Sequence, residues 1–243
     1  MFIKRLVAFT AAALMLAGGW AQDIADLAGA EIVVSAKDFT YASGVTESQI
    51  EAAANAFVSE KIKAGMTTYE KVVEIMKFVS DGEYYDGEGH SGSYDLIVSK
   101  RGNCSGATAS VEYLCKKLGI QCYYRTAKYD DNSTVPYGTV TDHRNNVINI
   151  DGISYIADAL FNNNYILVKA TDFTKYYFGK GKCDGTFVYH VLNDGAVEID
   201  EVLAFGLKSL TFPSQLGGKP VNNIYNIINW ADKSSIESVC KHV

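Results

Sequence analysis

A turn pair, Asp151-Gly152, constrains the fold of this chain more than any other feature, because it joins two apolar runs that read as strands. The runs cover residues 147–150 and 153–156, and Asp-Gly between such runs is typical of a two-residue β-hairpin turn. A turn of this length sets the two flanking isoleucines opposite each other. The sequence therefore predicts both an antiparallel hairpin and its register.

The predicted register brings a histidine and an aspartate together. Counting outward from the turn places Asn145 opposite Asp158, and His143 lies two residues further along the same face. Diagonal Cβ atoms in such a pair are about 7 Å apart, and imidazole and carboxylate side chains are long enough to close that gap to a hydrogen bond. We expect this contact to orient the imidazole.

Cys104 lies in a glycine-bracketed turn, Gly102-Asn-Cys104-Ser-Gly106, that opens a helical pattern and precedes the stop at Gly119. The apolar positions of that pattern are Ala107, Val111, Leu114, Cys115 and Leu118. The unpaired N–H groups at a helix start favour a thiolate over a thiol. With His143 as base and Asp158 as the carboxylate that orients it, the residues predict a Cys-His-Asp triad.

These motifs, in this order and spacing, resemble the transglutaminase-like superfamily over roughly residues 67–160. The resemblance implies an α+β fold in which the helix that carries the nucleophilic Cys packs on an antiparallel β-sheet that carries His and Asp, as in the papain-like core. Members include transglutaminases, peptide N-glycanases and bacterial cysteine proteases. The resemblance implies acyl chemistry on a peptide or protein amide. No cofactor is expected.

Several positions around the nucleophile are candidates for the oxyanion hole or the substrate cleft, namely Tyr94, Ser105, Arg144 and Asn145. Tyr94 precedes Cys104 by ten residues, so its hydroxyl is a candidate oxyanion donor; the alternative is a hydrophobic plug beneath the Cys helix. Arg144-Asn145 stands where the family commonly has Ala-Trp, and Ala107 where an aromatic residue is common. The walls of the predicted pocket are therefore unusual for the family.

The N-terminus reads as a signal peptide. Lys4 and Arg5 precede an apolar run that is too short for a comfortable membrane span, and small residues follow it. We expect a secreted or extracytoplasmic protein whose mature form begins near Gln22. The predicted organisation is a signal peptide (1–21), an N-terminal extension (22–45), a transglutaminase-like core (46–165) and a C-terminal accessory part packed on the core (166–243).

Charge and ligand patterns limit the partners. Loss of the two basic residues of the leader leaves 20 basic against 28 acidic residues, a net charge of −8, which argues against nucleic acid and anionic membrane as partners. No metal site is expected, because His90 and His242 lack partners at metal-ligand spacing and His190 reads as a structural strand residue. Asp130-Asp-Asn132 reads as a solvated turn, with a calcium loop as the alternative.

Local patterns predict further elements. Capping boxes at 46–49 and 67–70 begin two helices, strands are expected at 120–128, 140–150, 153–157, 187–191 and 197–199, and helices are expected around 224–231 and after 234.

Five cysteines leave at least one thiol free in a monomer under oxidising conditions, and the chemistry assigns that role to Cys104. Pairing of Cys115 with Cys122, and of Cys183 with Cys240, is open.

Two classes of function fit the sequence. In the first, Cys104 attacks an amide carbonyl and forms a thioester, which water resolves in a protease or amidase and an amine resolves in a transglutaminase. In the second, the same fold is a catalytically silent module that binds a peptide, a glycan or a cell-wall partner, as the changes at Arg144 and Asn145 suggest. The sequence leaves the substrate, the acyl acceptor and the oligomeric state open.

Overall fold

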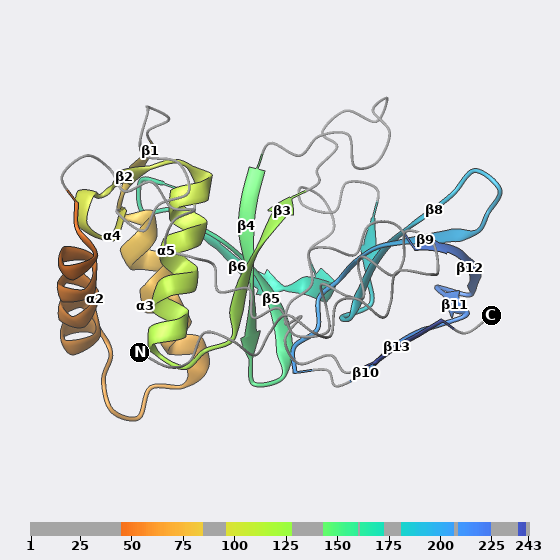
Figure 1. Cartoon of the computed structure of the whole chain (residues 1–243), viewed down its shortest axis with the longest axis horizontal. Coiled ribbons are helices and arrows are strands. Elements are labelled where there is room, and N and C mark those ends of the chain that lie inside the picture. The colour runs from red at the N-terminus through yellow and green to blue at the C-terminus, as the bar shows by residue number, and fades with distance from the viewer. Residues whose placement is uncertain are drawn as a thin grey trace, which may run out of the picture.

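The computed structural model describes residues 45–84, 96–127, 143–159, 161–172, 181–206, 209–224 and 238–241 of the chain. These residues form an α+β structure in which helices gather at one end and β-sheets fill the rest (Figure 1). The predicted fold class is therefore confirmed. None of the helices in these ranges is long and apolar enough to cross a membrane.

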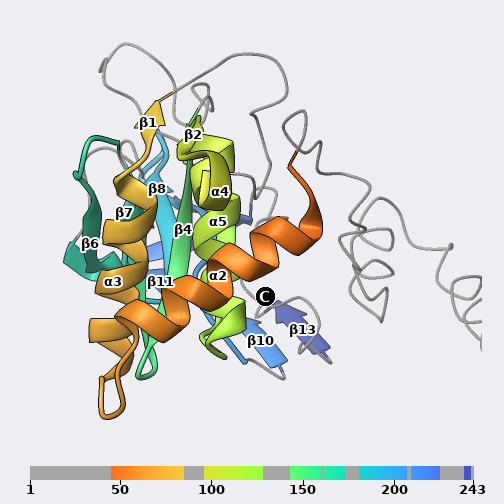
Figure 2. The same cartoon turned by 90° about the vertical axis from the view of Figure 1, so that its left-hand side faces the viewer.

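The first two helices begin at the capping boxes that the sequence predicts. Helix α2 (Glu47–Lys61) begins after Thr46, whose backbone N–H donates to Gln49 Oε1 at 2.8 Å, and helix α3 (Thr68–Ser80) begins after Thr67, whose N–H donates to Glu70 Oε2 at 2.8 Å. Each box satisfies N–H groups that a helix start leaves unpaired. Helix α2 lies across the outer side of the other helices (Figure 2).

Helix α5 (Cys104–Lys117) is the central helix of the core. Its inward side is fully buried at Val111, Leu114 and Cys115, against α3 and the sheet. The helix ends in a Schellman motif, in which the Ile120 N–H bonds to the Cys115 carbonyl at 2.9 Å and Gly119 adopts a φ of +69°. Glycine takes this left-handed conformation without a Cβ clash, which explains why the predicted stop is a glycine.

The core sheet has four antiparallel strands in the order β3 (Cys122–Ala127), β4 (His143–Ile150), β5 (Ile153–Asp158) and β6 (Ile166–Lys169). Side chains alternate between its faces. Ile148, Ile150 and Ala157 pack with the helices, whereas Val147 and Ile156 pack with the C-terminal part of the chain. The short helix α4 (Leu96–Ser99) and the two-residue parallel pair β1 (Glu83–Tyr84) and β2 (Arg101–Gly102) lead into α5.

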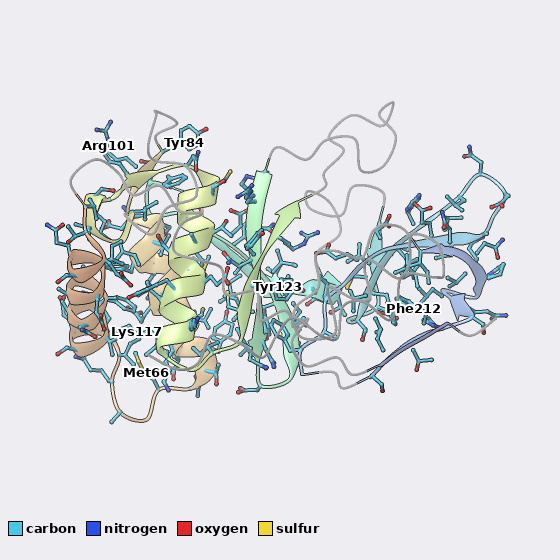
Figure 3. All side chains as sticks on the ribbon, viewed as in Figure 1. Met66, Tyr84, Arg101, Lys117, Tyr123 and Phe212 are labelled. Carbon is cyan, nitrogen blue, oxygen red and sulfur yellow. The ribbon has the colours of Figure 1, made fainter. Side chains whose placement is uncertain are left out.

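The C-terminal part is a second β layer. Its main sheet has the order β11 (Gln215–Leu216), β12 (Lys219–Ile224), β9 (Val197–Val202), β8 (Phe187–Val191) and β7 (Lys182–Cys183). Beside it, β10 (Ser209–Phe212) pairs in parallel with β13 (Ser238–Lys241), and the 3-10 turn η1 (Ala170–Asp172) leads out of the core. Tyr123 of the core donates a hydrogen bond to the Val202 carbonyl at 3.5 Å. Figure 3 labels Tyr123 and also Phe212, which belongs to the hydrophobic cluster of the C-terminal part.

One prediction for this end of the chain is wrong. A helix was expected after 234, but residues 238–241 form strand β13. Pairing with a distant strand overrides the local helical spacing there, since tertiary contacts outweigh weak intrinsic propensity. The helix expected around 224–231 lies outside the described residues except for Ile224, which is the last residue of strand β12 and pairs with Ile199 of β9.

None of the four cysteines Cys104, Cys115, Cys122 and Cys183 forms a disulfide. The two pairings that the sequence left open are therefore not formed in this structure. The thiols of Cys115 and Cys122 do contact each other, however, across the end of α5 and the start of β3.

Candidate active site

Cys104 is the first residue of α5, where the sequence predicts it. The buried Asn103 caps the helix, and its Oδ1 accepts hydrogen bonds from the N–H groups of Ser105 at 3.0 Å and Gly106 at 3.3 Å. The carbonyl of Cys104 accepts a hydrogen bond from Thr108 Oγ1 at 2.6 Å. The cap fixes the first turn, so the Cys104 thiol is held at the positive end of the helix dipole.

The hairpin has the register that its turn predicts. Ile150 pairs with Ile153, and the ladder continues in step to Asn146 and Ala157. The diagonal contact also forms, because His143 Nε2 lies 2.6 Å from Asp158 Oδ2. The Asp158 side chain is 3% exposed and that of His143 is 26% exposed, so the pair is shielded from water on the carboxylate side and open on the other.

The structure brings Cys104 to this pair. The Cys104 thiol hydrogen-bonds the His143 ring and the Arg144 backbone N–H, so the start of α5 lies beside the start of β4. Since Nε2 faces Asp158, Nδ1 is the ring nitrogen that remains for the sulfur. Burial would raise the pKa of Cys104, but the bonds to His143 and the Arg144 N–H, and the charge of His143, outweigh burial and hold that pKa below 9.0.

The charge state of His143 follows from the same contacts. Burial lowers the pKa of His143, but the hydrogen bonds to Asp158 and Cys104 and the charges of both groups have a larger, opposite effect. The net result is a pKa raised to about 10. At neutral pH the imidazole is therefore protonated. A lowered thiol pKa beside a raised imidazole pKa favours a thiolate–imidazolium pair over the neutral pair.

The cleft candidates are placed differently from one another. The Ser105 side chain hydrogen-bonds the Cys104 sulfur. Arg144 contributes its backbone N–H, while its guanidinium carbon lies 5.8 Å from the centre of the Tyr124 ring. The sequence suggested Asn145 as a residue of the oxyanion hole or the cleft. It is only 1% exposed, so it is buried behind the site and does not form a wall of an open cleft. Tyr94 lies outside the described residues.

A buried ion pair behind the site was not predicted. Arg125 of β3, which is fully buried, donates from Nε to Glu201 Oε1 at 2.8 Å and from Nη2 to Glu201 Oε2 at 2.6 Å. Its Nη1 lies 3.4 Å from Asn145 Oδ1. By the hairpin register Asn145 is the neighbour of Asp158, so β9 of the C-terminal part supplies a charge to the polar layer that backs the triad residues. Arg125 lies in the strand predicted at 120–128, but Glu201 lies beyond the run predicted at 197–199, so no sequence pattern related the two residues.

Two hollows lined by described residues lie elsewhere. One of about 290 Å³ is lined by residues that include Glu112, Lys116 and Cys122, and one of about 350 Å³ is lined by residues that include Thr68 and Asn149. Both include Gly119, at the C-terminal end of α5, and α5 spans about 20 Å from that end to Cys104. Neither hollow is therefore part of the Cys104 site.

Comparison with known proteins places the central part of the chain. Residues 55–170 match the model of the transglutaminase-like superfamily. Three of the solved structures that are similar to this chain are each covered over less than two thirds of their own length. A putative cysteine protease from Cytophaga hutchinsonii is 20% identical, with 55% of this chain and 50% of that chain covered and a TM-score of 0.37. No curated protein matches.

Two further similar structures are named for other activities. A TGase is 13% identical, with 49% of this chain and 35% of that chain covered and a TM-score of 0.35. An arylamine N-acetyltransferase from Bacillus cereus, described as having a Cys-His-Glu catalytic triad, is 11% identical, with 63% of each chain covered and a TM-score of 0.37.

Proposed function

Because residues 55–170 are a transglutaminase-like core, and this superfamily consists of cysteine-dependent enzymes, we propose that the protein is an acyl-transfer enzyme with Cys104 as nucleophile. One observation carries the proposal: Cys104, at a capped helix start, hydrogen-bonds an imidazole whose other nitrogen lies 2.6 Å from the buried Asp158. The proposed substrate is a peptide or protein amide, because the family resemblance implies acyl chemistry on such amides.

The steps follow from the charges of the site. The Cys104 thiolate attacks the amide carbonyl carbon, and the carbonyl oxygen becomes an oxyanion. The imidazolium of His143 then donates its Nδ1 proton to the leaving amine, the C–N bond breaks, and a thioester to Cys104 remains. The neutral imidazole next takes a proton from water or from a primary amine, which attacks the thioester and releases the acyl group.

The oxyanion needs hydrogen-bond donors at the start of α5. We assign one donor to the Cys104 backbone N–H, because Asn103 caps the next two N–H groups and so fixes the geometry of the turn. The Tyr94 hydroxyl remains a candidate for the second donor, with a hydrophobic plug beneath the Cys helix as the alternative, and Tyr94 lies outside the described residues. Asp158 holds the imidazole in the orientation that presents Nδ1 to the sulfur.

Export is part of the proposal and rests on the sequence alone. Residues 1–21 have the charged start, apolar run and small residues of a signal peptide, and these residues lie outside the described ranges. The silent binding module remains the alternative. Its support was the change at Arg144 and Asn145, but Arg144 contacts the sulfur through its backbone and Asn145 is buried, so neither substitution removes a group from the proposed reaction.

Thiol labelling separates the two functions. At pH 7 we expect iodoacetamide to modify Cys104 and to leave Cys183 unmodified, because burial raises the pKa of Cys183 to about 11. Cys183→Ala is therefore the matched control for Cys104→Ala. Equal and slow labelling of both thiols would favour the binding module.

Turnover then identifies the reaction. Peptide amides are incubated with and without a primary amine, and the free acid or the new amide is measured by mass spectrometry. We expect Cys104→Ala to abolish turnover, His143→Ala to be nearly as severe, and Asp158→Asn to be milder, because the last change leaves the base in place. Turnover that survives in Cys104→Ala would refute the proposed nucleophile.

A further inference from the structure

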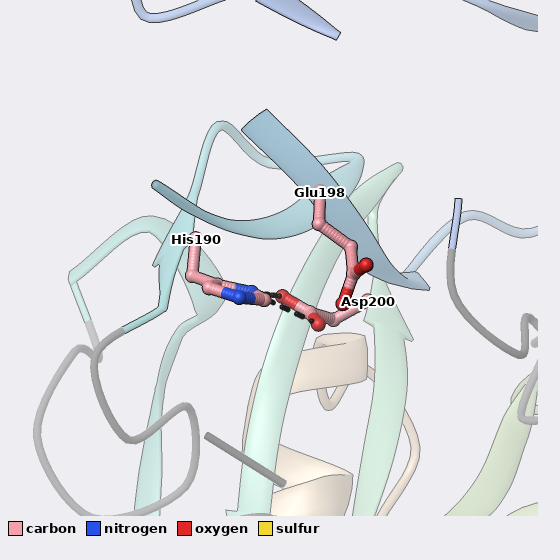
Figure 4. A group of neighbouring side chains, drawn as sticks. All are labelled: His190, Glu198 and Asp200. Carbon is pink, nitrogen blue, oxygen red and sulfur yellow. Dashed lines mark hydrogen bonds and ion pairs between the residues drawn. The ribbon is translucent and has the colours of Figure 1, made fainter. Parts of the chain in front are cut away.

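A histidine and two carboxylates gather in the C-terminal sheet, apart from the cysteine chemistry. His190 is on β8, and Glu198 and Asp200 are on β9 (Figure 4). One potential ligand atom from each lies within 4.8 Å of the others. Figure 4 shows the His190 ring and the Glu198 carboxylate both directed toward Asp200.

The pairing of β8 with β9 brings the three side chains together. His190 pairs directly with Glu198, and Tyr189 pairs with Ile199, but Val188 pairs with Glu201, so Asp200 is an extra residue on β9. Glu198 and Asp200 are two residues apart and therefore point to the same side of the strand as His190. The opposite side, with Ile199 and Tyr189, packs in the hydrophobic cluster of this sheet.

The side chains are already close to a ligand arrangement. His190 Nδ1 lies 3.0 Å from Asp200 Oδ2 and 3.2 Å from Oδ1. Asn223 of β12 donates from Nδ2 to Glu198 Oε2, which orients that carboxylate. The side chain of Asp200 is 1% exposed and that of His190 is 15% exposed. Two largely buried side chains therefore lie beside the partly exposed carboxylate of Glu198.

We propose that His190, Glu198 and Asp200 bind a zinc ion. Zinc takes imidazole nitrogen and carboxylate oxygen together at about 2.0–2.2 Å, and two ligands of a tetrahedral zinc are then about 3.3 Å apart. The observed 3.0 and 3.2 Å fit this spacing with little movement of His190 or Asp200. Calcium and magnesium prefer oxygen ligands throughout, so the imidazole selects against them.

Each residue has a defined task in this site. Nδ1 of His190 and one oxygen of each carboxylate bind the ion, and water takes the fourth position. Asn223 holds Glu198 in place, as partners of metal ligands commonly do. A bound ion links β8 to β9 at the bulge and so stabilises the C-terminal sheet. The sequence assigned His190 a structural role, because its carboxylate partners become neighbours only through strand pairing.

The test is a titration of the full mature chain, after removal of metal with EDTA, with zinc chloride by isothermal titration calorimetry. A Cys104→Ala background keeps the reactive thiol from binding the ion. We expect one zinc per chain, at least tenfold weaker binding in Glu198→Gln, and a larger loss in His190→Ala. Glu47→Gln, an exposed carboxylate of α2, is the matched control and keeps the affinity.

Cobalt(II) as a spectroscopic probe identifies the ligands. We expect the visible bands of a four-coordinate cobalt site, without the near-ultraviolet thiolate-to-metal charge-transfer band, and loss of these bands in Glu198→Gln. Three outcomes overturn the proposal: no zinc binding to the wild-type chain, binding that Glu198→Gln and His190→Ala leave unchanged, or a thiolate band that persists in those variants. Glu198 is partly exposed, so Glu198→Gln is a mild change that tests the site without disturbing the buried Asp200.

Discussion

The contact between His143 and Asp158 decides how the candidate active site is charged, and Asp158→Asn tests it most directly. Burial lowers the pKa of His143, and the bonds and charges of Asp158 and Cys104 together raise it to about 10. Asparagine keeps the size of the side chain and removes its charge. The imidazolium then loses the partner that lies 2.6 Å from Nε2.

The size of the effect follows from that distance. An opposite charge within about 4–6 Å shifts a pKa by about 1–3 pH units, which is about 1.4–4 kcal/mol in the stability of the charged form. We therefore expect the pKa of His143 in the variant to lie between about 7 and 9. The thiolate of Cys104 loses part of the positive charge that stabilises it, so its pKa moves back up toward 9.0.

Two pH profiles measure these shifts. The rate of Cys104 alkylation by iodoacetamide is proportional to the fraction of Cys104 that is thiolate. In the variant the rising limb of the plot of this rate against pH should therefore move to higher pH, and the rate at pH 7 should fall by about tenfold or more. Amide turnover needs the imidazolium, so its alkaline limb should move down from about pH 10. Asp151→Asn, in the exposed hairpin turn, is the control. If Asp158→Asn leaves both limbs in place, the assigned role of Asp158 is wrong.

Three further predictions concern the rest of the chain. Glu201→Gln removes the carboxylate that pairs with the buried guanidinium of Arg125 and should lower the free energy of unfolding by about 3–5 kcal/mol in urea, whereas Glu83→Gln, in an exposed pair, should cost less than about 1 kcal/mol. Oxidised glutathione should join Cys115 and Cys122, with loss of two hydrogen atoms and two equivalents of reduced glutathione formed; thiols that both stay open to alkylation contradict this. The intact mass of the exported protein should correspond to a chain that begins near Gln22. A product that retains Met1 rules out cleavage of the signal peptide.

The sequence by itself determined the parts of the site that depend on short-range geometry. The Asp151-Gly152 turn sets the hairpin register, and strand alternation then decides that His143 and Asp158 share a face. Asn103 caps the helix start through hydrogen bonds to residues two and three positions away, so the position of Cys104 at the start of the helix could also be predicted from the sequence. In each case the partners are close in sequence, or one counting rule relates them.

Tertiary structure alone decided what depends on distant pairing. Arg125 and Glu201 are 76 residues apart, and no local pattern shows that one buried charge answers the other. His190 meets Glu198 and Asp200 only through the pairing of β8 with β9, and the parallel pairing of β10 with β13 replaces a helix that local spacing favoured. A strand's partner is chosen by packing across the whole fold, so the sequence near the strand does not specify it.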